Sequence, residues 1–322
     1  MNKTIEISSL EILLKYINQI KIIFPIMSYG KDYGFFLYRP LGLGNQIAIY
    51  ILAASLKKNN RNIKNLLFPN LQLESRKHFF KSIKSWLNRS NINFKNIIKD
   101  YKRIKFINEY NLIKSQKNSN EKSYFNIDTG VLYLSTHFPN IDKTFSNYIK
   151  DNLKEIQSDF LNDFKKYLSS KKIDLLNQVQ KDSIGIHIRR GDFWQSEVKD
   201  DNLKYNASPN DLFYKNIIKK LLNSSDKIIY IYSDQEKNQT LDSLDIRKYL
   251  NQRIFITSPI MSAPELFLNM TCHSVLFQSN STISTWAGIV SGSICPCPAK
   301  NVPYFANIYF ENFISIDKYF DI

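Results

Sequence analysis

The chain contains little cysteine. Its 322 residues include only Cys272, Cys295 and Cys297, all near the C-terminal end. An odd number confined to one end does not build the disulfide framework of a small secreted domain. The four histidines show no spacing that would complete a four-ligand zinc site with Cys295 and Cys297. We therefore predict free thiols and no structural zinc.

The chain also lacks a long hydrophobic run. Residues 12–27 are apolar, but lysine, asparagine and glutamine interrupt them and Pro25 closes them. Such a stretch is too short and too polar to span a bilayer or to act as a secretory signal. Leucines and isoleucines recur at helical spacing from Leu10 to Ile20, which predicts an amphipathic helix in an N-terminal extension, residues 1–30. Packing of this helix on the body of the protein is favoured over a membrane-surface anchor. We expect a cytoplasmic protein, peripheral at the inner face of the membrane only under the second alternative.

Acidic residues are outnumbered. The chain has 29 Asp and Glu against 44 Lys and Arg, a net charge of +15, and much of the excess lies between Lys57 and Lys105. A basic domain can bind nucleic acid, an anionic lipid surface or acidic substrates. The aromatic residues in this region have the spacing of a helical core face backed by solvated lysines. We therefore expect no nucleic-acid partner and keep contact with an anionic membrane as an alternative, while the oligomeric state stays unknown.

Glycine and proline are scarce as well, with nine and ten residues, and no stretch rich in either marks a linker. The length nonetheless exceeds that of a usual single core, so two domains are expected. The preferred boundary lies near Ser169-Ser170 and divides the body into residues 31–170 and 171–322.

The most informative stretch present is His187-Ile188-Arg189-Arg190-Gly191-Asp192. It ends a predicted strand in which isoleucines alternate with Gly185, His187 and Arg189. The glycine permits a turn after the two arginines, and two guanidiniums could then clasp a pyrophosphate. The alternative is an arginine pair that forms a salt bridge with Asp192 in a loop.

A second cluster, Gly42-Leu43-Gly44-Asn45-Gln46, stands between a predicted strand, residues 35–38, and a predicted helix, residues 47–56. Glycines before a helix let backbone amides approach an anion, and the helix dipole attracts it. A plain tight turn is the alternative. The two amide side chains would suit the hydroxyls of a sugar.

A third cluster follows the predicted strand 274–277 and opens a helix that runs to Val290. Ser281 or Thr282 there could cap the helix or bind a phosphate, and the two interpretations are compatible. Further strands are predicted at 227–232 and 253–256. The repeat of strand, polar loop and helix predicts an α/β fold with a parallel sheet, and ligands of such sheets bind beyond the carboxyl ends of the strands.

The His187–Phe193 stretch resembles the His-x-Arg-Arg-Gly-Asp-Tyr signature of the alpha-1,2-fucosyltransferases, glycosyltransferase family 11. Three further stretches resemble motifs of that family in the same order: Gly42–Gln46, Ile231–Asp234 and Asn280–Trp286. The chain departs from the family pattern at three positions. Gln235 replaces an aspartate, Ile283 a phenylalanine and Thr285 a tryptophan, which puts the acceptor in doubt more than the donor.

The resemblance implies an inverting, metal-independent transferase that needs no cofactor. It would move L-fucose from GDP-fucose to a galactoside hydroxyl in alpha-1,2 linkage, in the synthesis of a glycan or a surface polysaccharide such as an O-antigen. The implied fold is GT-B, two Rossmann-like domains with parallel sheets facing a central cleft. Residues 31–170 would form the acceptor-side domain and residues 171–322 the GDP-sugar-binding domain. The alternatives are a transferase of another linkage or GDP-sugar, and a catalytically silent glycan-binding or nucleic-acid-binding protein on this scaffold.

The resemblance also suggests roles for single residues. Arg190 would neutralise the charge that accumulates on the β-phosphate as GDP leaves, and Arg189 would bridge phosphate and base. His187 would contact ribose or guanine, unless it is merely packed. The other expected donor-binding residues are Gly42, Gly44, Asn45, Gln46, Asp234, Asn280, Ser281 and Thr282.

Two carboxylates could take the proton of the acceptor hydroxyl. Asp192 stands beside the arginines, which would keep it ionised but weakly basic. Glu197 stands five residues further on, and the resemblance leans slightly toward it. Either could instead be structural, Asp192 as a salt-bridge partner of the arginines and Glu197 as an exposed loop residue.

Overall fold

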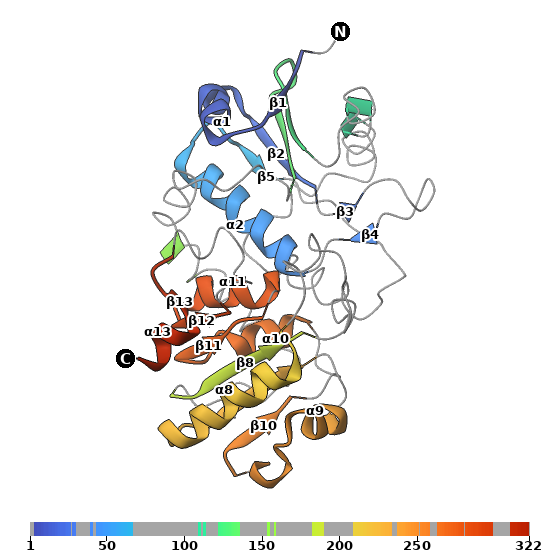
Figure 1. The fold of residues 1–322 in the computed structure, drawn as a ribbon. Helices are drawn as coiled ribbons and strands as arrows, with labels where there is room; N and C mark the ends of the chain where they lie inside the picture. The colour runs from blue at the N-terminus through green and yellow to red at the C-terminus, as the bar shows by residue number, and fades with distance from the viewer. Residues whose placement is uncertain are drawn as a thin grey trace. The chain divides into compact units, whose positions relative to one another are not determined.

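The computed structural model describes residues 3–26, 28–29, 39–40, 43–66, 109–110, 112–113, 122–135, 153–154, 158, 182–189, 209–233, 237–250, 252–257, 263–279, 281–298 and 310–321. The chain divides into two compact units, residues 1–167 and 168–322 (Figure 1).

The first unit contains a five-stranded sheet in the order β1-β6-β7-β2-β5. Its strands are β1 (Thr4–Ile7), β2 (Ile22–Pro25), β5 (Asn65–Leu66), β6 (Ser123–Asn126) and β7 (Val131–Leu134). Its helical elements are α1 (Leu10–Tyr16), the 3₁₀ turn η1 (Ile17–Gln19) and α2 (Leu43–Asn59), and a separate antiparallel pair joins β3 (Ser28–Tyr29) to β4 (Arg39–Pro40). One cluster of buried side chains in this unit is rich in aromatic residues: Phe24, Tyr110, Ile113, Tyr124, Val131 and Tyr133.

The sheet of the first unit is mixed, whereas parallel sheets were expected in both domains. β7, β2 and β5 run parallel, but β1, β6 and β7 pair antiparallel. The cause is the short connection between β6 and β7, in which Gly130 has φ +68° and donates its amide to the Asn126 carbonyl. A parallel pair needs a crossover of a dozen or more residues, so strands joined this closely must pair antiparallel.

The N-terminal residues also differ from the expected extension with one long helix. Helix α1 begins after Ser9, whose hydroxyl accepts from the Ile12 amide, and covers only seven residues. After η1 the chain enters β2, which lies inside the sheet between β7 and β5. Leu10 and Leu13 are buried, so α1 packs on the body of this unit. The physical reason is the run Ile22–Phe24, a short β-branched and aromatic segment that favours a strand over continued helix.

The second unit contains a parallel sheet. β8 (Ile184–Ile188), β9 (Ile229–Ser233), β10 (Ile254–Ile256) and β11 (Val275–Phe277) pair in the order β10-β9-β8-β11. Backbone hydrogen bonds from Leu276 to Ile294 and from Gln278 to Pro296 place β12 (Cys295–Cys297) beside β11, and β12 pairs with β13 (Phe313–Ser315). Numbered within this unit, the order is 3-2-1-4-5-6, which is that of the doubly wound dinucleotide-binding fold. The predicted α/β class and parallel sheet are confirmed for this unit.

Helices cover the second sheet. α8 (Asp211–Ser224), α9 (Lys237–Leu244) and α13 (Ile316–Phe320) pack on the face that carries Ile184, Ile186 and Ile188. α10 (Ala263–Met270) and α11 (Thr282–Ser291) contact each other and contribute nothing to that cluster. The opposite face of β8 carries Gly185 and His187, because side chains alternate along a strand. No helix among the described residues is long and apolar enough to cross a membrane.

Candidate functional site

The strand order of the second unit identifies where a ligand would bind. β8 is the first strand of the unit and β11 the fourth, and they lie side by side and parallel. The strand order reverses between these two strands. In doubly wound sheets this switch point forms a crevice beyond the carboxyl ends of the strands, where ligands bind. Arg189 directly follows β8, and Ser279 and Ser281 follow β11.

Arg189 reaches the start of α11. Its Nη1 donates to the Ser281 hydroxyl over 3.3 Å, although the two residues are far apart in the sequence. Ser281 is the N-cap residue of α11, but its side chain makes no capping hydrogen bond to the helix. A guanidinium and a helix N-terminus are both positive and repel each other, whereas both attract an anion. The pair is therefore suited to bind a phosphate group of a ligand.

Two side chains of α11 form hydrogen bonds to the backbone of its N-cap residue, Ser281. The buried hydroxyls of Ser284 and Thr285 both donate to the Ser281 carbonyl, at 3.1 and 3.0 Å. The Ser281 amide donates to the Ser279 carbonyl at 2.8 Å. Thr282 is the first residue of the helix. Amides of a first helical turn have no acceptor within the helix, so this fixed turn can offer them to a ligand.

His187 lies in β8, two residues before Arg189. Its side chain is buried, and Nδ1 lies 2.6 Å from the Ser279 hydroxyl. Burial, and secondarily the nearby Arg189 charge, lower the pKa of His187 to about 3. The imidazole is therefore neutral at neutral pH. It can bind a ligand through a hydrogen bond, but it adds no positive charge to the site.

The structure brings His187, Arg189, Ser281 and Thr282 together at the switch point. Gly44, Asn45 and Gln46 belong to the other unit, in the first turn of α2, which begins four residues earlier than predicted. They therefore stand in a helix N-terminus and not in a turn before it. The remaining expected residues, Gly42, Arg190, Asp192, Glu197, Asp234 and Asn280, lie outside the described part of the chain.

Ser279 was not singled out from the sequence as a site residue. A signal was present, because Ser279 stands two residues before Ser281, as His187 stands two residues before Arg189. That spacing puts His187 and Arg189 on one face of an extended segment, whereas a tight turn joins Ser279 to Ser281. The pairing became visible only with the register of β8 against β11.

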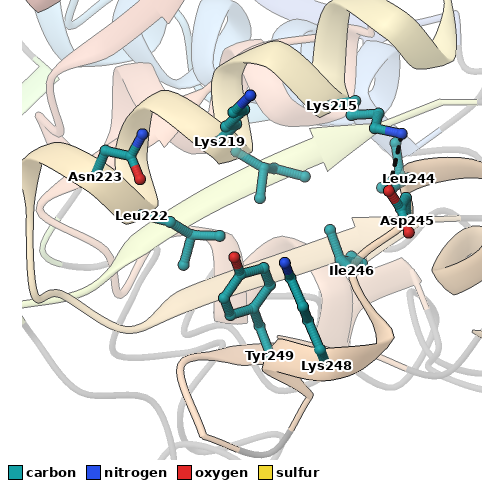
Figure 2. A pocket seen from close by; sticks show the side chains of 10 residues that line it. Lys215, Lys219, Leu222, Asn223, Leu244, Asp245, Ile246, Lys248 and Tyr249 are labelled. Carbon is teal, nitrogen blue, oxygen red and sulfur yellow. Dashed lines mark ion pairs between the residues drawn. The ribbon is translucent and has the colours of Figure 1, made fainter.

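A surface hollow of about 230 Å³ lies elsewhere in the second unit, between α8 and residues 244–249 (Figure 2). Lys215 forms an ion pair with Asp245 there at 3.0 Å, and Lys219 and Lys248 also line it. None of the expected site residues lines this hollow.

The cysteines are free thiols, and Cys295 and Cys297 are buried. Burial raises the pKa of Cys297 to about 12 and that of Cys295 well above its usual range, so both stay protonated. Protonated thiols are poor metal ligands. Across the residues that the structure describes, no group of three or more His, Cys, Asp or Glu side chains could hold a metal ion.

The model of a family described as glycosyl transferase family 11 matches residues 43–296. The matched span includes α2 and everything from β8 to the middle of β12, and therefore the whole switch-point site. No curated protein matches the chain.

Proposed function

Since the chain belongs to glycosyl transferase family 11 and is therefore a glycosyltransferase, we propose that it transfers L-fucose from GDP-fucose to a galactoside. The proposed product has an alpha-1,2 linkage, formed with inversion. The proposed setting is the synthesis of a glycan or surface polysaccharide. In a GT-B arrangement the first unit would be the acceptor-side domain and the second unit the donor-binding domain.

The observation that carries the proposal is the pairing of Arg189 with Ser281 at the N-terminus of α11. This pairing suits the pyrophosphate of GDP, because it offers a planar cation and helix amides at one place. His187 and Thr282 extend the same set of donors. No residue of this set requires a metal ion to act.

The chemistry needs negative charge to be stabilised on the leaving group. As the bond from fucose to the β-phosphate breaks, the sugar develops oxocarbenium character and charge accumulates on GDP. Arg190 is the proposed partner of that charge, and Arg189, oriented by Ser281, holds the diphosphate. Asp192 or Glu197 takes the proton from the acceptor hydroxyl on the opposite face of the sugar.

The function is tested by a screen of GDP-sugars against galactoside acceptors, run with and without excess chelator. We expect GDP release from GDP-fucose, a fucosylated galactoside as product, and undiminished activity in chelator. Turnover of a different GDP-sugar would identify another transferase. No GDP release from any donor would identify a binding protein, and activity restored only by added magnesium or manganese would contradict the metal-independent mechanism.

A further inference from the structure

The second unit contains two buried histidines that occupy opposite edges of one sheet. His273 lies just before β11, at the amino edge. Both of its ring nitrogens have partners: Nδ1 lies 2.8 Å from the Ser183 hydroxyl and Nε2 lies 2.5 Å from the Tyr232 hydroxyl. An added Cβ at Gly185 would lie 2.6 Å from its ring. Both ring nitrogens of His273 are therefore engaged in hydrogen bonds within the fold and are not available to a ligand.

His187 differs from His273 in one respect. It is buried to the same degree, and its Nδ1 is engaged by a serine in the same way, at 2.6 Å from the Ser279 hydroxyl. Yet within the described residues no hydrogen bond involves its Nε2. His187 is the next-to-last residue of β8 and therefore lies near the carboxyl edge, where the ligand of a doubly wound sheet binds.

Two polar side-chain contacts join the end of β8 to the segment that follows β11. His187 contacts Ser279, and Arg189 contacts Ser281, each two residues further along its own segment. The contact of Arg189 holds its guanidinium at the N-terminus of α11. The contact of His187 with Ser279 fixes its imidazole ring in the same way, through Nδ1.

We propose that Ser279 is a positioning residue of the donor site. Its hydroxyl donates to Nδ1 of His187, which places the ring proton on Nε2 and directs that N–H at an oxygen of the nucleotide diphosphate sugar. This role rests on the proposed function, because it assumes a phosphate-bearing ligand at the switch point.

The direction of the hydrogen bond follows from the surroundings. Arg189 and the first-turn amides of α11 are donors, so ligand oxygens that accept hydrogen bonds converge at this place. An Nε2 without a proton would present a lone pair to those oxygens and repel them. With the proton on Nε2, the neutral ring adds one more donor to the set.

Two measurements on the full chain test the role. The ¹⁵N NMR shifts of the His187 ring report which nitrogen carries the proton, and we expect Nε2 in the wild-type protein and a mixture of tautomers in Ser279→Ala. GDP affinity, measured by calorimetry, should fall about three- to tenfold in Ser279→Ala, the range for one hydrogen bond lost. Ser279→Cys has a side chain of similar size with a weaker hydrogen-bond donor, so its GDP affinity should lie between those of the wild-type protein and Ser279→Ala. This variant replaces Ser279→Ala in the test if Ser279→Ala does not fold.

Ser183→Ala is the matched control, because it removes the same kind of serine–histidine contact at the other edge of the sheet. It should lower stability as Ser279→Ala does but leave GDP affinity unchanged. Equal losses of affinity in both variants, or a wild-type proton on Nδ1 of His187, would overturn the role of Ser279 alone. A wild-type protein that binds no GDP would overturn the proposed function together with this role.

Discussion

Ser281 occupies the N-cap position of α11, yet its hydroxyl accepts from Arg189 and not from the helix. A serine at an N-cap usually contributes about 1 kcal/mol through its capping hydrogen bond. Ser281 makes no such capping bond, and its hydroxyl instead holds the guanidinium of Arg189. In the proposed function, the Ser281 side chain therefore serves ligand binding more than the stability of the helix.

We predict that Ser281→Ala lowers the free energy of unfolding by less than about 0.5 kcal/mol, since no capping bond is lost, but weakens GDP binding about three- to tenfold. Urea unfolding and calorimetry measure the two effects. Asn210→Ala is the control, because Asn210 caps α8 through the Phe213 amide. It should cost about 1 kcal/mol and leave GDP affinity intact. The reverse pattern would show that Ser281 acts as an ordinary cap.

Asp192 and Glu197 are the two candidates for the base that takes the proton from the acceptor hydroxyl. We predict that Glu197→Gln loses turnover by more than about tenfold while it still binds GDP, whereas Asp192→Asn loses GDP affinity because the arginines lose an orienting partner. Steady-state kinetics and GDP titration separate the two roles. The opposite assignment would make Asp192 the base. Normal turnover in both variants would show that the proton leaves through water.

The two buried histidines make stability depend on pH. Burial holds the pKa of His187 and of His273 at about 3, whereas an unfolded histidine titrates near 6.5. Below pH 6.5 the unfolded chain binds protons that the folded chain does not, so the folded state loses stability as the pH falls toward 3. We predict a loss on the order of 2 kcal/mol for each histidine between pH 6.5 and 5.

Urea unfolding at pH 7 and pH 5 measures this loss. His273→Gln should remove about half of the pH dependence, because one of the two titrating groups is gone. A stability that does not change between these pH values would contradict the neutral state of both rings.

At the scale of elements, α11 packs very closely on β12. Gly288 lies in the middle of this helix, and a Cβ added there would stand only 2.3 Å from the Cys295 Sγ and 3.1 Å from the Gln278 Nε2. An alanine normally stabilises a helix by about 1 kcal/mol relative to glycine. At Gly288 the overlap outweighs this gain, since overpacking in a core costs about 1–3 kcal/mol.

We predict that Gly288→Ala destabilises the protein by about 1–3 kcal/mol and that Cys295→Ala, by removing the sulfur, restores much of the loss in the double variant. Gly292→Ala is the contrast. Gly292 ends the same helix at φ +68° with open space around its Cβ position, so its alanine variant suffers from backbone strain alone. Cys295→Ala should not rescue it. Equal rescue of both variants in urea unfolding would contradict a local steric cause.

The elements of the second unit were largely predictable, whereas those of the first were predictable only in part. The helix expected at residues 47–56 lies within α2, but no strand of the five-stranded sheet was expected. Strands 227–232, 253–256 and 274–277 were expected from short apolar runs that end in polar residues, and β9, β10 and β11 occupy them. In the N-terminal region, leucines and isoleucines fit a helical period up to Ile20, so the strand that follows was read as more helix. A run of four residues is too short for its period to decide between the two.

The candidate site was predictable only in part, because strand pairing between distant segments leaves no local signal. The sequence indicated donors after two separate strands. It did not indicate that β8 and β11 are neighbours, or that Arg189 would meet Ser281 and His187 would meet Ser279. These contacts depend on the order of strands in the sheet.

At the scale of the whole molecule, the positive charge is unevenly distributed. Residues 1–167 contain 27 Lys and Arg against 13 Asp and Glu, whereas residues 168–322 contain 17 against 16. The unit that holds the switch-point site is therefore nearly neutral. In the proposed function, the second unit therefore attracts a diphosphate through Arg189, Arg190 and the start of α11, and the general field of this unit contributes little.

The strand order also sets when the site can exist during synthesis of the chain. The contacts of Arg189 and His187 are each made 92 residues later in the sequence. At about 5–20 residues per second, a ribosome needs roughly 5–18 seconds to supply the partner segment. β9 is synthesised within that interval. Once it has paired, β8 has β9 on one side and, until β11 follows, an open edge on the other, which invites pairing with another nascent chain. Synthesis of β11 and of the residues up to Ser281 therefore both closes this edge and brings together the residues of the proposed donor site.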